Sequence, residues 1–242
     1  LGATGAFGPL SVTLDLYKID ISDQFYASRS ITVTDEIRVQ LIAAGVPGAD
    51  TIGAVQFFQN AFDSTTEGVD LVATYVADWG ASGTTSFTLS SNYNTFSVEG
   101  VNIDGLFLEE DVYDFENGTP NIRTTFTASH EIGDFTFLGR ANYYGSYTPS
   151  QCFTGVAADG YSCPGGLITE EFGSEVLFDI EASYAYDDTT RFTFGVRNVT
   201  DEYPDAPNYN TLRETGNGRI YRSDSIVDWQ GGFVYFKAKK TF

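Results

Sequence analysis

The sequence of 242 residues contains no methionine, one histidine and two cysteines. No window approaches the run of about 20 apolar residues that a membrane-spanning helix needs. That test does not detect a membrane β-barrel, because barrel strands alternate apolar and polar residues. Basic residues are also scarce, with 13 Lys and Arg against 33 Asp and Glu, giving a net charge of −20. We therefore expect no nucleic-acid partner, since nucleic-acid binding needs a basic surface. The charge fits an anionic extracellular face.

The shortage of histidine also limits catalysis. No serine nucleophile elbow, His–acid pair or metal-ligand spacing is present, so we expect no enzyme. His130 falls on the apolar side of a predicted strand, near a turn, which favours an interfacial residue over a catalytic base.

The two cysteines lie close together in the polar segment CFTGVAADGYSC. Two thiols without a nearby histidine make a poor metal site. A local disulfide between Cys152 and Cys163, formed in an oxidising compartment, is the better interpretation.

Aromatic residues are abundant at 15%, and the rest of the chain repeats the pattern of residues 176–204. In this stretch Val176, Phe178 and Ile180 alternate with Asp179 and Glu181. A period of two is typical of a strand with one apolar and one wet face. A tight polar turn at 187–190 and a second alternating run complete a hairpin.

Eight such strands are predicted along the chain. Short connections centre on Gly80, Gly133 and Asp188, and they alternate with long ones at 23–54, 99–119, 148–173 and 200–228. A short helix is predicted at 35–44, and residues 1–9 are interpreted as the tail of a preceding element plus a turn.

The alternation of connection lengths is informative about the fold class. A sandwich does not sort its loops by end, whereas outer-membrane barrels have short periplasmic turns and longer extracellular loops. The predicted strands also exceed the roughly 9–11 residues that cross a bilayer. The expected fold class is therefore all-β, an antiparallel transmembrane β-barrel segment of eight strands with a periplasmic C-terminus. The pattern leaves open whether the eight strands close on themselves or belong to a larger barrel.

Three stretches resemble the C-terminal part of the barrel of TonB-dependent outer-membrane receptors. They are FFQNAFDSTTEGVDLVATY at 57–75, the hairpin ending in GVRNVTDEYP at 195–204, and GGFVYFKAKKTF, which ends in Phe242. The resemblance covers the eight strands of residues 1–242 and implies the last eight strands of a 22-stranded barrel. The family's plug, TonB-contacting box and earlier strands are not in the sequence, and its start at Leu1 without a leader favours a fragment. Lys239 and Lys240 also make the end less apolar than is usual in the family.

The resemblance implies an active transporter of the bacterial outer membrane. It imports a scarce ligand such as a siderophore, cobalamin or an oligosaccharide. The implied partners are outer-membrane lipid and lipopolysaccharide, the rest of the barrel with its plug, and the TonB complex through the N-terminal part. The alternative is an independent eight-stranded barrel with a structural or adhesion role.

Candidate site residues fall in the long connections. The last loop contains aromatic, Asn and Arg side chains that suit binding of a sugar or a chelate ring. The competing interpretation is ordinary loop packing. The candidate ligand-binding residues are Tyr203, Tyr209, Asn210, Arg213, Arg219 and Tyr221. An acidic cluster is either a solvated loop or a calcium site, since Ca²⁺ takes several carboxylate oxygens: Glu109, Glu110, Asp111 and Asp114. Asn198 and Asp201 are expected to cap a strand end through bonds to the backbone. Apart from possible calcium, no cofactor is expected.

Overall fold

The computed structural model describes the chain from residue 1 to 241 except residues 29, 102–107, 154–161, 209–219 and 223–224; residue 242 is also outside the described set. Its main feature is a nine-stranded antiparallel sheet in the order β1-β2-β5-β6-β7-β8-β11-β12-β13. The strands of this sheet are β1 (Gly2–Phe7), β2 (Leu10–Ala27), β5 (Phe58–Asp78), β6 (Thr84–Val101), β7 (Ile122–Ile132), β8 (Phe135–Tyr144), β11 (Glu175–Asp187), β12 (Thr190–Arg197) and β13 (Phe233–Lys240).

Smaller elements fill the long connections. They are the helices α1 (Asp35–Ala43) and α2 (Glu109–Asn117), and two short hairpins, β3 (Ile31–Thr32) with β4 (Ala54–Val55) and β9 (Ser150–Cys152) with β10 (Leu167–Thr169). A single 3₁₀ turn, η1 (Gly80–Ser82), joins β5 to β6. Neither α-helix in the described chain is long and apolar enough to cross a membrane.

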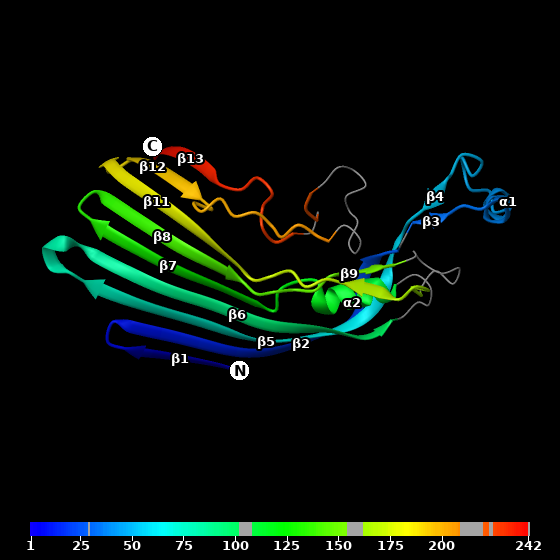
Figure 1. Cartoon of the computed structure of the whole chain (residues 1–242), viewed down its shortest axis with the longest axis horizontal. Coiled ribbons are helices and arrows are strands. Elements are labelled where there is room, and N and C mark those ends of the chain that lie inside the picture. The colour runs from blue at the N-terminus through cyan, green and yellow to red at the C-terminus, as the bar shows by residue number, and fades with distance from the viewer. Residues whose placement is uncertain (29, 102–107, 154–161, 209–219, 223–224, 242) are drawn as a thin grey trace.

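The connections sort strictly by end. All the tight turns lie at one end of the sheet, and all the long connections lie at the other, where α1 with β3 and β4 projects farthest (Figure 1). Gly8 and Gly133 supply the positive φ angles, 61° and 55°, that two of the tight turns require. The predicted alternation of short and long connections is confirmed, and so is the predicted helix near residues 35–44.

The predicted number of strands is wrong, because the sheet has nine strands rather than eight. Residues 2–7 form a strand of their own and pair with 10–15 across the turn at Gly8. An odd count of alternating strands makes β1 and β13 run in the same direction, at opposite edges of an open sheet. No ladder joins them in the described residues, so the self-closed eight-stranded barrel is not the fold observed.

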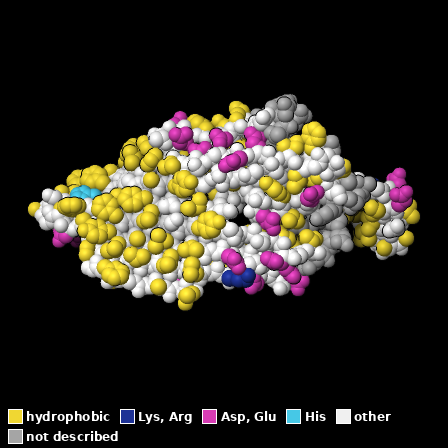
Figure 2. Space-filling view, turned by 60° about the horizontal axis from the view of Figure 1, so that its bottom comes forward, with side chains coloured by type: hydrophobic (Ala, Val, Ile, Leu, Met, Phe, Trp, Pro, Cys, Tyr) yellow, Lys and Arg dark blue, Asp and Glu magenta, His cyan; other side chains and the backbone are white. Residues whose placement is uncertain are grey.

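The two faces of the sheet differ in chemistry. We call one the apolar face; a cross-strand row on it is Tyr75, Phe87, Ala128, Gly139, Ile180, Val196 and Val234. Its side chains are open to the surroundings, with Ile180 49% and Phe236 67% exposed. Figure 2 shows hydrophobic side chains gathered over the turn-end half of the molecule, with acidic ones toward the loop end.

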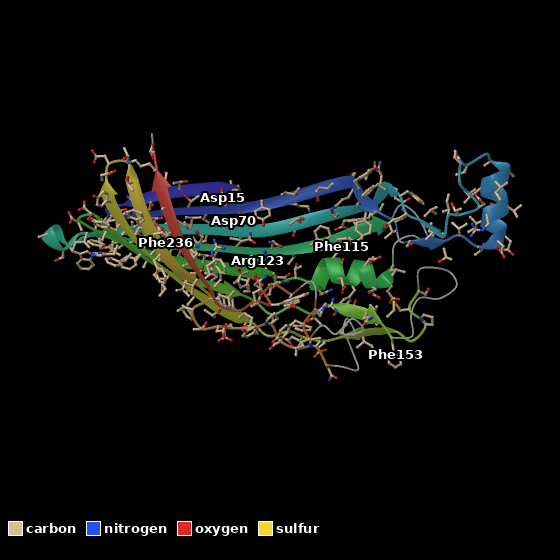
Figure 3. The ribbon with its side chains drawn as sticks, turned by 90° about the horizontal axis from the view of Figure 1, so that it is seen from above. Asp15, Asp70, Phe115, Arg123, Phe153 and Phe236 are labelled. Carbon is tan, nitrogen blue, oxygen red and sulfur yellow. A yellow bond between two sulfur atoms is a disulfide. The ribbon has the colours of Figure 1, made fainter. Side chains whose placement is uncertain are left out.

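The opposite side of the sheet is the polar face. A cross-strand row on it consists of Asp15, Asp70, Asn92, Arg123 and Tyr144. Figure 3 labels Asp15, Asp70 and Arg123 of this row. A sheet that is apolar on one side, polar on the other and exposed on both fits the wall of a water-filled barrel in a membrane. The conventional hydrophobic clusters lie instead at the loop end.

Candidate functional site

We call α2, the β9–β10 hairpin and the described residues between β12 and β13 the loop layer. A cluster of aromatic rings fixes α2, and the side chain of Phe62 is fully buried at its centre. The ring of Phe115 from α2 lies 5.2 Å from Phe62, 5.4 Å from Tyr26 and 5.9 Å from Phe96, measured between ring centroids. Phe62 is on the same face of β5 as Asp70, and Phe96 is on the same face of β6 as Asn92, which is the polar face. Because Phe115 packs against Phe62 and Phe96, α2 lies over the polar face.

The acidic cluster lies in the helix α2 and not in the loop expected from its sequence, and its carboxylates accept backbone hydrogen bonds. Asp114 Oδ1 accepts bonds from the N–H and the hydroxyl of Ser150, at 2.6 and 2.9 Å. Glu110 Oε2 accepts from the N–H of Cys152 at 2.8 Å, and Asp111 Oδ2 accepts from the N–H of Leu108 at 3.0 Å. The acids therefore tie α2 to β9 and close its N-terminus.

The predicted calcium site is not assembled by these contacts. In the part of the chain that the structure describes, the only three potential metal ligands whose atoms converge are Glu110, Cys152 and Cys163. The two sulfurs of that group are bonded to each other, so they are not free ligands. Calcium binding by Glu109, Glu110, Asp111 and Asp114 stays a prediction, and a calcium titration that raises the Tm would support it.

Burial changes the acidity of Asp114 in the loop layer. Burial raises the pKa of its carboxyl, and this outweighs the lowering by the Ser150 hydrogen bonds and by the positive charge of Arg222. Arg222 belongs to the last long connection and is itself only 6% exposed. The last connection and α2 therefore act on each other at this point.

The predicted disulfide between Cys152 and Cys163 is present, with the two Cα atoms 5.1 Å apart. Cys152 is also the last residue of β9 and pairs with Leu167 of β10. Covalent closure of this short segment reduces its freedom in the unfolded chain. The disulfide and the β9–β10 ladder thus hold the same part of the loop layer.

Asn198 and Asp201 order the chain just after β12. Both adopt positive φ angles, 47° and 57°, which Asn and Asp tolerate better than most residues. The Asn198 amide donates to the carbonyl of Glu202 at 2.7 Å and accepts from its N–H at 3.0 Å. Asp201 Oδ1 accepts from the N–H of Gly232 at 2.7 Å, just before β13. These are side-chain-to-backbone bonds of the kind expected for a capping role.

Of the six predicted ligand residues, the structure brings two together. The rings of Tyr203 and Tyr221 stack with centroids 6.2 Å apart and planes 19° from parallel. Tyr203 is 43% exposed, and the charge of Asp201 raises the pKa of its phenol. The other four predicted ligand residues lie outside the described residues: Tyr209, Asn210, Arg213 and Arg219. Phe242, the C-terminal residue of the family resemblance, also lies outside them.

The polar face carries hydrogen-bond networks that the alternating sequence pattern does not predict. The amide of Asn92 donates to Asp70 Oδ1 at 2.6 Å and to the Tyr17 hydroxyl at 3.0 Å. Farther along the sheet, Glu181 Oε2 accepts from the Tyr235 hydroxyl at 2.6 Å and from Lys237 at 3.4 Å. The period of two identifies the face on which these residues lie, but it does not identify their partners.

Gly68 lies inside β5, where a glycine marks either a bulge or the close approach of another group. The ladder is regular at this residue, and the hydroxyl end of the Tyr17 ring occupies the place of a Cβ atom. Gly195 accommodates the ring of Tyr235 in the same way. The close approach is therefore the correct alternative, and glycine allows a tyrosine ring to lie against a neighbouring strand on the polar face.

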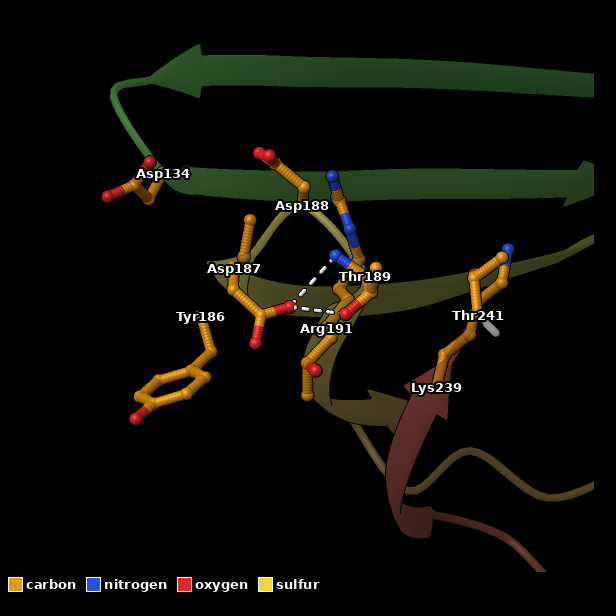
Figure 4. A pocket seen from close by; sticks show the side chains of 10 residues that line it. Asp134, Tyr186, Asp187, Asp188, Thr189, Arg191, Lys239 and Thr241 are labelled. Atoms are coloured by element: carbon orange, nitrogen blue, oxygen red, sulfur yellow. Dashed lines mark hydrogen bonds between the residues drawn. The ribbon is translucent and has the colours of Figure 1, made fainter.

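A polar pocket of about 320 Å³ lies at the turn end, between the β7–β8 and β11–β12 turns and the end of β13 (Figure 4). Asp187 Oδ1 accepts bonds from the N–H and the hydroxyl of Thr189, at 2.8 and 2.7 Å. Lys240 donates to the hydroxyls of Thr189 and Thr190, both at 2.8 Å. These bonds tie the last strand to the preceding turn, which accounts for the polar lining without a ligand.

Comparison with known proteins agrees with this geometry. The family model described as "TonB dependent receptor-like, beta-barrel" matches residues 1–199. No curated protein sequence matches the chain.

Three of the similar solved structures with TM-scores above 0.5 serve as examples. The outer membrane transporter YddB from Escherichia coli has a TM-score of 0.65 at 10% identity, and the match covers 100% of this chain and 32% of the YddB chain. The siderophore receptor PirA from Acinetobacter baumannii has a TM-score of 0.61 at 15% identity, and the match covers 100% of this chain and 31% of PirA. The copper transporter OprC has a TM-score of 0.56 at 13% identity, and the match covers 100% of this chain and 30% of OprC.

The chain thus spans about a third of the length of these structures. At such low identities the likeness establishes the fold, and the family match over residues 1–199 establishes the family. Members of that family are transporters of the bacterial outer membrane and are not enzymes. The chain belongs to the TonB-dependent receptor β-barrel family.

Proposed function

We propose that this chain is the C-terminal barrel portion of an active transporter that imports a scarce ligand across the outer membrane. One observation carries the proposal: an ordered loop layer lies over the polar face of a sheet whose other face is exposed and apolar. A barrel wall needs such a sheet, and a receptor needs loops held over the lumen. The walls and loops bind and enclose the ligand, and no bond of the ligand is broken.

The open edges of the sheet support a larger assembly. Unpaired strand edges are not viable in lipid, because their backbone polar groups have no water to bond. We propose that β1 and β13 each pair with further strands to complete a barrel of 22, with a plug domain in its lumen. The TonB complex acts on that plug and supplies the energy for import.

The loop layer narrows the choice of ligand. Its acids, together with the net charge of −20, disfavour a highly anionic ligand, because like charges repel at the entrance. The stacked pair of Tyr203 and Tyr221 offers a surface for a sugar or a chelate ring. Since relatives of the same fold are named as a siderophore receptor and a copper transporter, a metal chelate is the first candidate, ahead of cobalamin and oligosaccharides.

Uptake by living cells tests the proposal. A strain lacking the gene is compared with a complemented strain, using labelled siderophores, copper chelates, cobalamin and oligosaccharides, with and without a protonophore. We expect one ligand class to accumulate only in the complemented strain and only when the membrane is energised. Equal uptake of the whole panel by both strains, or uptake that survives the protonophore, would contradict it.

A further inference from the structure

The apolar face is not uniformly covered by side chains. A groove of about 430 Å³ opens on it in the turn-end half of the sheet, within the ~300–1,000 Å³ range of small-molecule sites. Its lining comes from β7, β8, β11 and β12 and includes Ala128, His130, Phe137, Gly139, Ala182 and Phe194. Gly139 pairs with Ala128 on one side and with Ile180 on the other, so the floor of the groove is backbone.

A polar donor stands at the turn end of this groove. The indole N–H of Trp79 donates to the hydroxyl oxygen of Thr85 at 2.8 Å, and the same oxygen lies 2.8 Å from Nδ1 of His130. Among the described residues, Nδ1 is the only side-chain acceptor within reach of the Thr85 hydroxyl hydrogen. We therefore assign the neutral ring its proton on Nε2.

Nε2 of His130 carries a hydrogen whether the ring is neutral or protonated. In a protonated ring both nitrogens carry hydrogens, so Nε2 still donates. Nδ1 of His130 is held by Thr85, and within the described residues Nε2 has no hydrogen-bond partner, so it keeps a free donor direction beside the apolar groove. An occupant with an apolar body and an anionic acceptor at one end would satisfy both features.

We propose that the groove binds one acyl chain of a phospholipid of the periplasmic leaflet, whose phosphate accepts a hydrogen bond from Nε2 of His130. The inference rests on the proposed membrane orientation, in which the tight turns are periplasmic. The groove continues the apolar face, which the proposed barrel turns toward lipid, so an acyl chain is the apolar group that reaches it. His130 lies two residues from the end of β7 at the turn, at headgroup depth, where Trp79 also belongs as an interfacial residue.

Gly139 gives a way to fill the groove without disturbing the sheet. A Cβ atom built at Gly139 meets no atom within 4 Å, so the side chain of Gly139→Leu extends into the groove. Ala73→Leu is the matched control, since Ala73 lies on the apolar face of β5 and does not line the groove. His130→Phe keeps a ring of similar shape but removes the donor.

The experiment uses the assembled barrel that contains this chain, purified with limited delipidation and examined by native mass spectrometry. We expect one retained phospholipid in the parent protein and in Ala73→Leu, and its loss in Gly139→Leu. His130→Phe should weaken retention about tenfold, the value of a hydrogen bond to a charged group. Ligand uptake should be unchanged in Gly139→Leu, which shows that the variant is folded.

Equal retention in Gly139→Leu and the parent would overturn the site. So would the absence of any retained lipid in the parent, or retention of lipopolysaccharide alone, which belongs to the other leaflet. Loss of the lipid with normal uptake separates this site from transport. Retained lipid in a barrel that imports none of the tested ligands would count against the proposed function and leave the lipid site standing.

Discussion

The two ends of this sheet are held together by different interactions. At the turn end, consecutive strands pair in regular ladders and the side chains alternate between two faces, so backbone hydrogen bonds supply most of the order. At the loop end, order comes from the aromatic cluster around Phe62, a disulfide and carboxylates that accept backbone bonds. The first kind of order tolerates many sequences, whereas the second depends on individual side chains.

This contrast has a functional meaning. A barrel wall only has to satisfy its backbone and present apolar groups to lipid, so its chemistry is repetitive. A binding layer has to place particular groups over the lumen. The specific contacts of α2, β9 and the last connection are therefore where we expect ligand selectivity to lie.

The largest effect is expected from removing the aromatic anchor of the loop layer. Phe62→Ala leaves a cavity under α2 and should reduce local stability by about 3–5 kcal/mol. Hydrogen exchange of α2 and β9 should accelerate, while exchange in β7 and β8 stays slow. The control is Phe126→Ala, whose ring is 44% exposed on the apolar face and leaves no cavity. Unchanged exchange in α2 would show that the cluster is not its anchor.

A charge on the apolar face tests the wall itself. Leu89→Arg should lower the free energy of unfolding in bilayers by roughly 2–4 kcal/mol, as for charged residues near the midplane of other barrels. Thr88→Arg, one residue away on the polar face, should cost much less. Reversible unfolding in lipid vesicles measures both variants. An equal loss of unfolding free energy in the two variants would contradict a placement of one face in lipid and the other in water.

The cap after β12 joins the two regions, so its loss should be intermediate. Asn198→Ala leaves the N–H and carbonyl of Glu202 without their side-chain partner and should cost about 1–2 kcal/mol. Asn198→Asp keeps the acceptor for the N–H but loses the donor, and should cost less. Thermal unfolding of the variants gives the comparison, and a larger loss in Asn198→Asp would contradict the assignment.

The smallest effect is a pH dependence of the loop layer. The pKa of Asp114 is raised by burial, so the folded state holds its proton more tightly than the unfolded state does. The stabilisation that Asp114 gives to the folded state is fully present below the pKa of this carboxyl in the unfolded chain. It is lost as the pH rises through its pKa in the folded chain. Hydrogen exchange of α2 should therefore slow on acidification in the parent relative to Asp114→Asn. The same pH profile in both proteins would rule out Asp114 as the cause.

The strands were predictable because a period of two, broken by turn residues, is a local signal. That signal fails at Gly2–Phe7, where small residues give little contrast between faces and the strand merged with its turn. It also fails at α2, whose acidic sequence favours a loop, although Val112 and Phe115 lie three residues apart on one side of the helix and pack against the cluster. The pairs Asp114–Ser150 and Asn92–Asp70 depend on tertiary placement, which no local pattern encodes.

The most direct test of the account is the environment of successive side chains along β6. Spin labels at residues 86–90 of the assembled barrel in lipid vesicles report collisions with oxygen, which concentrates in the bilayer, and with a water-soluble nickel complex. The account predicts oxygen accessibility at Phe87 and Leu89 and nickel accessibility at Ser86, Thr88 and Ser90. An absence of alternation, or alternation of the opposite phase, would contradict the assignment of one face to lipid and the other to water.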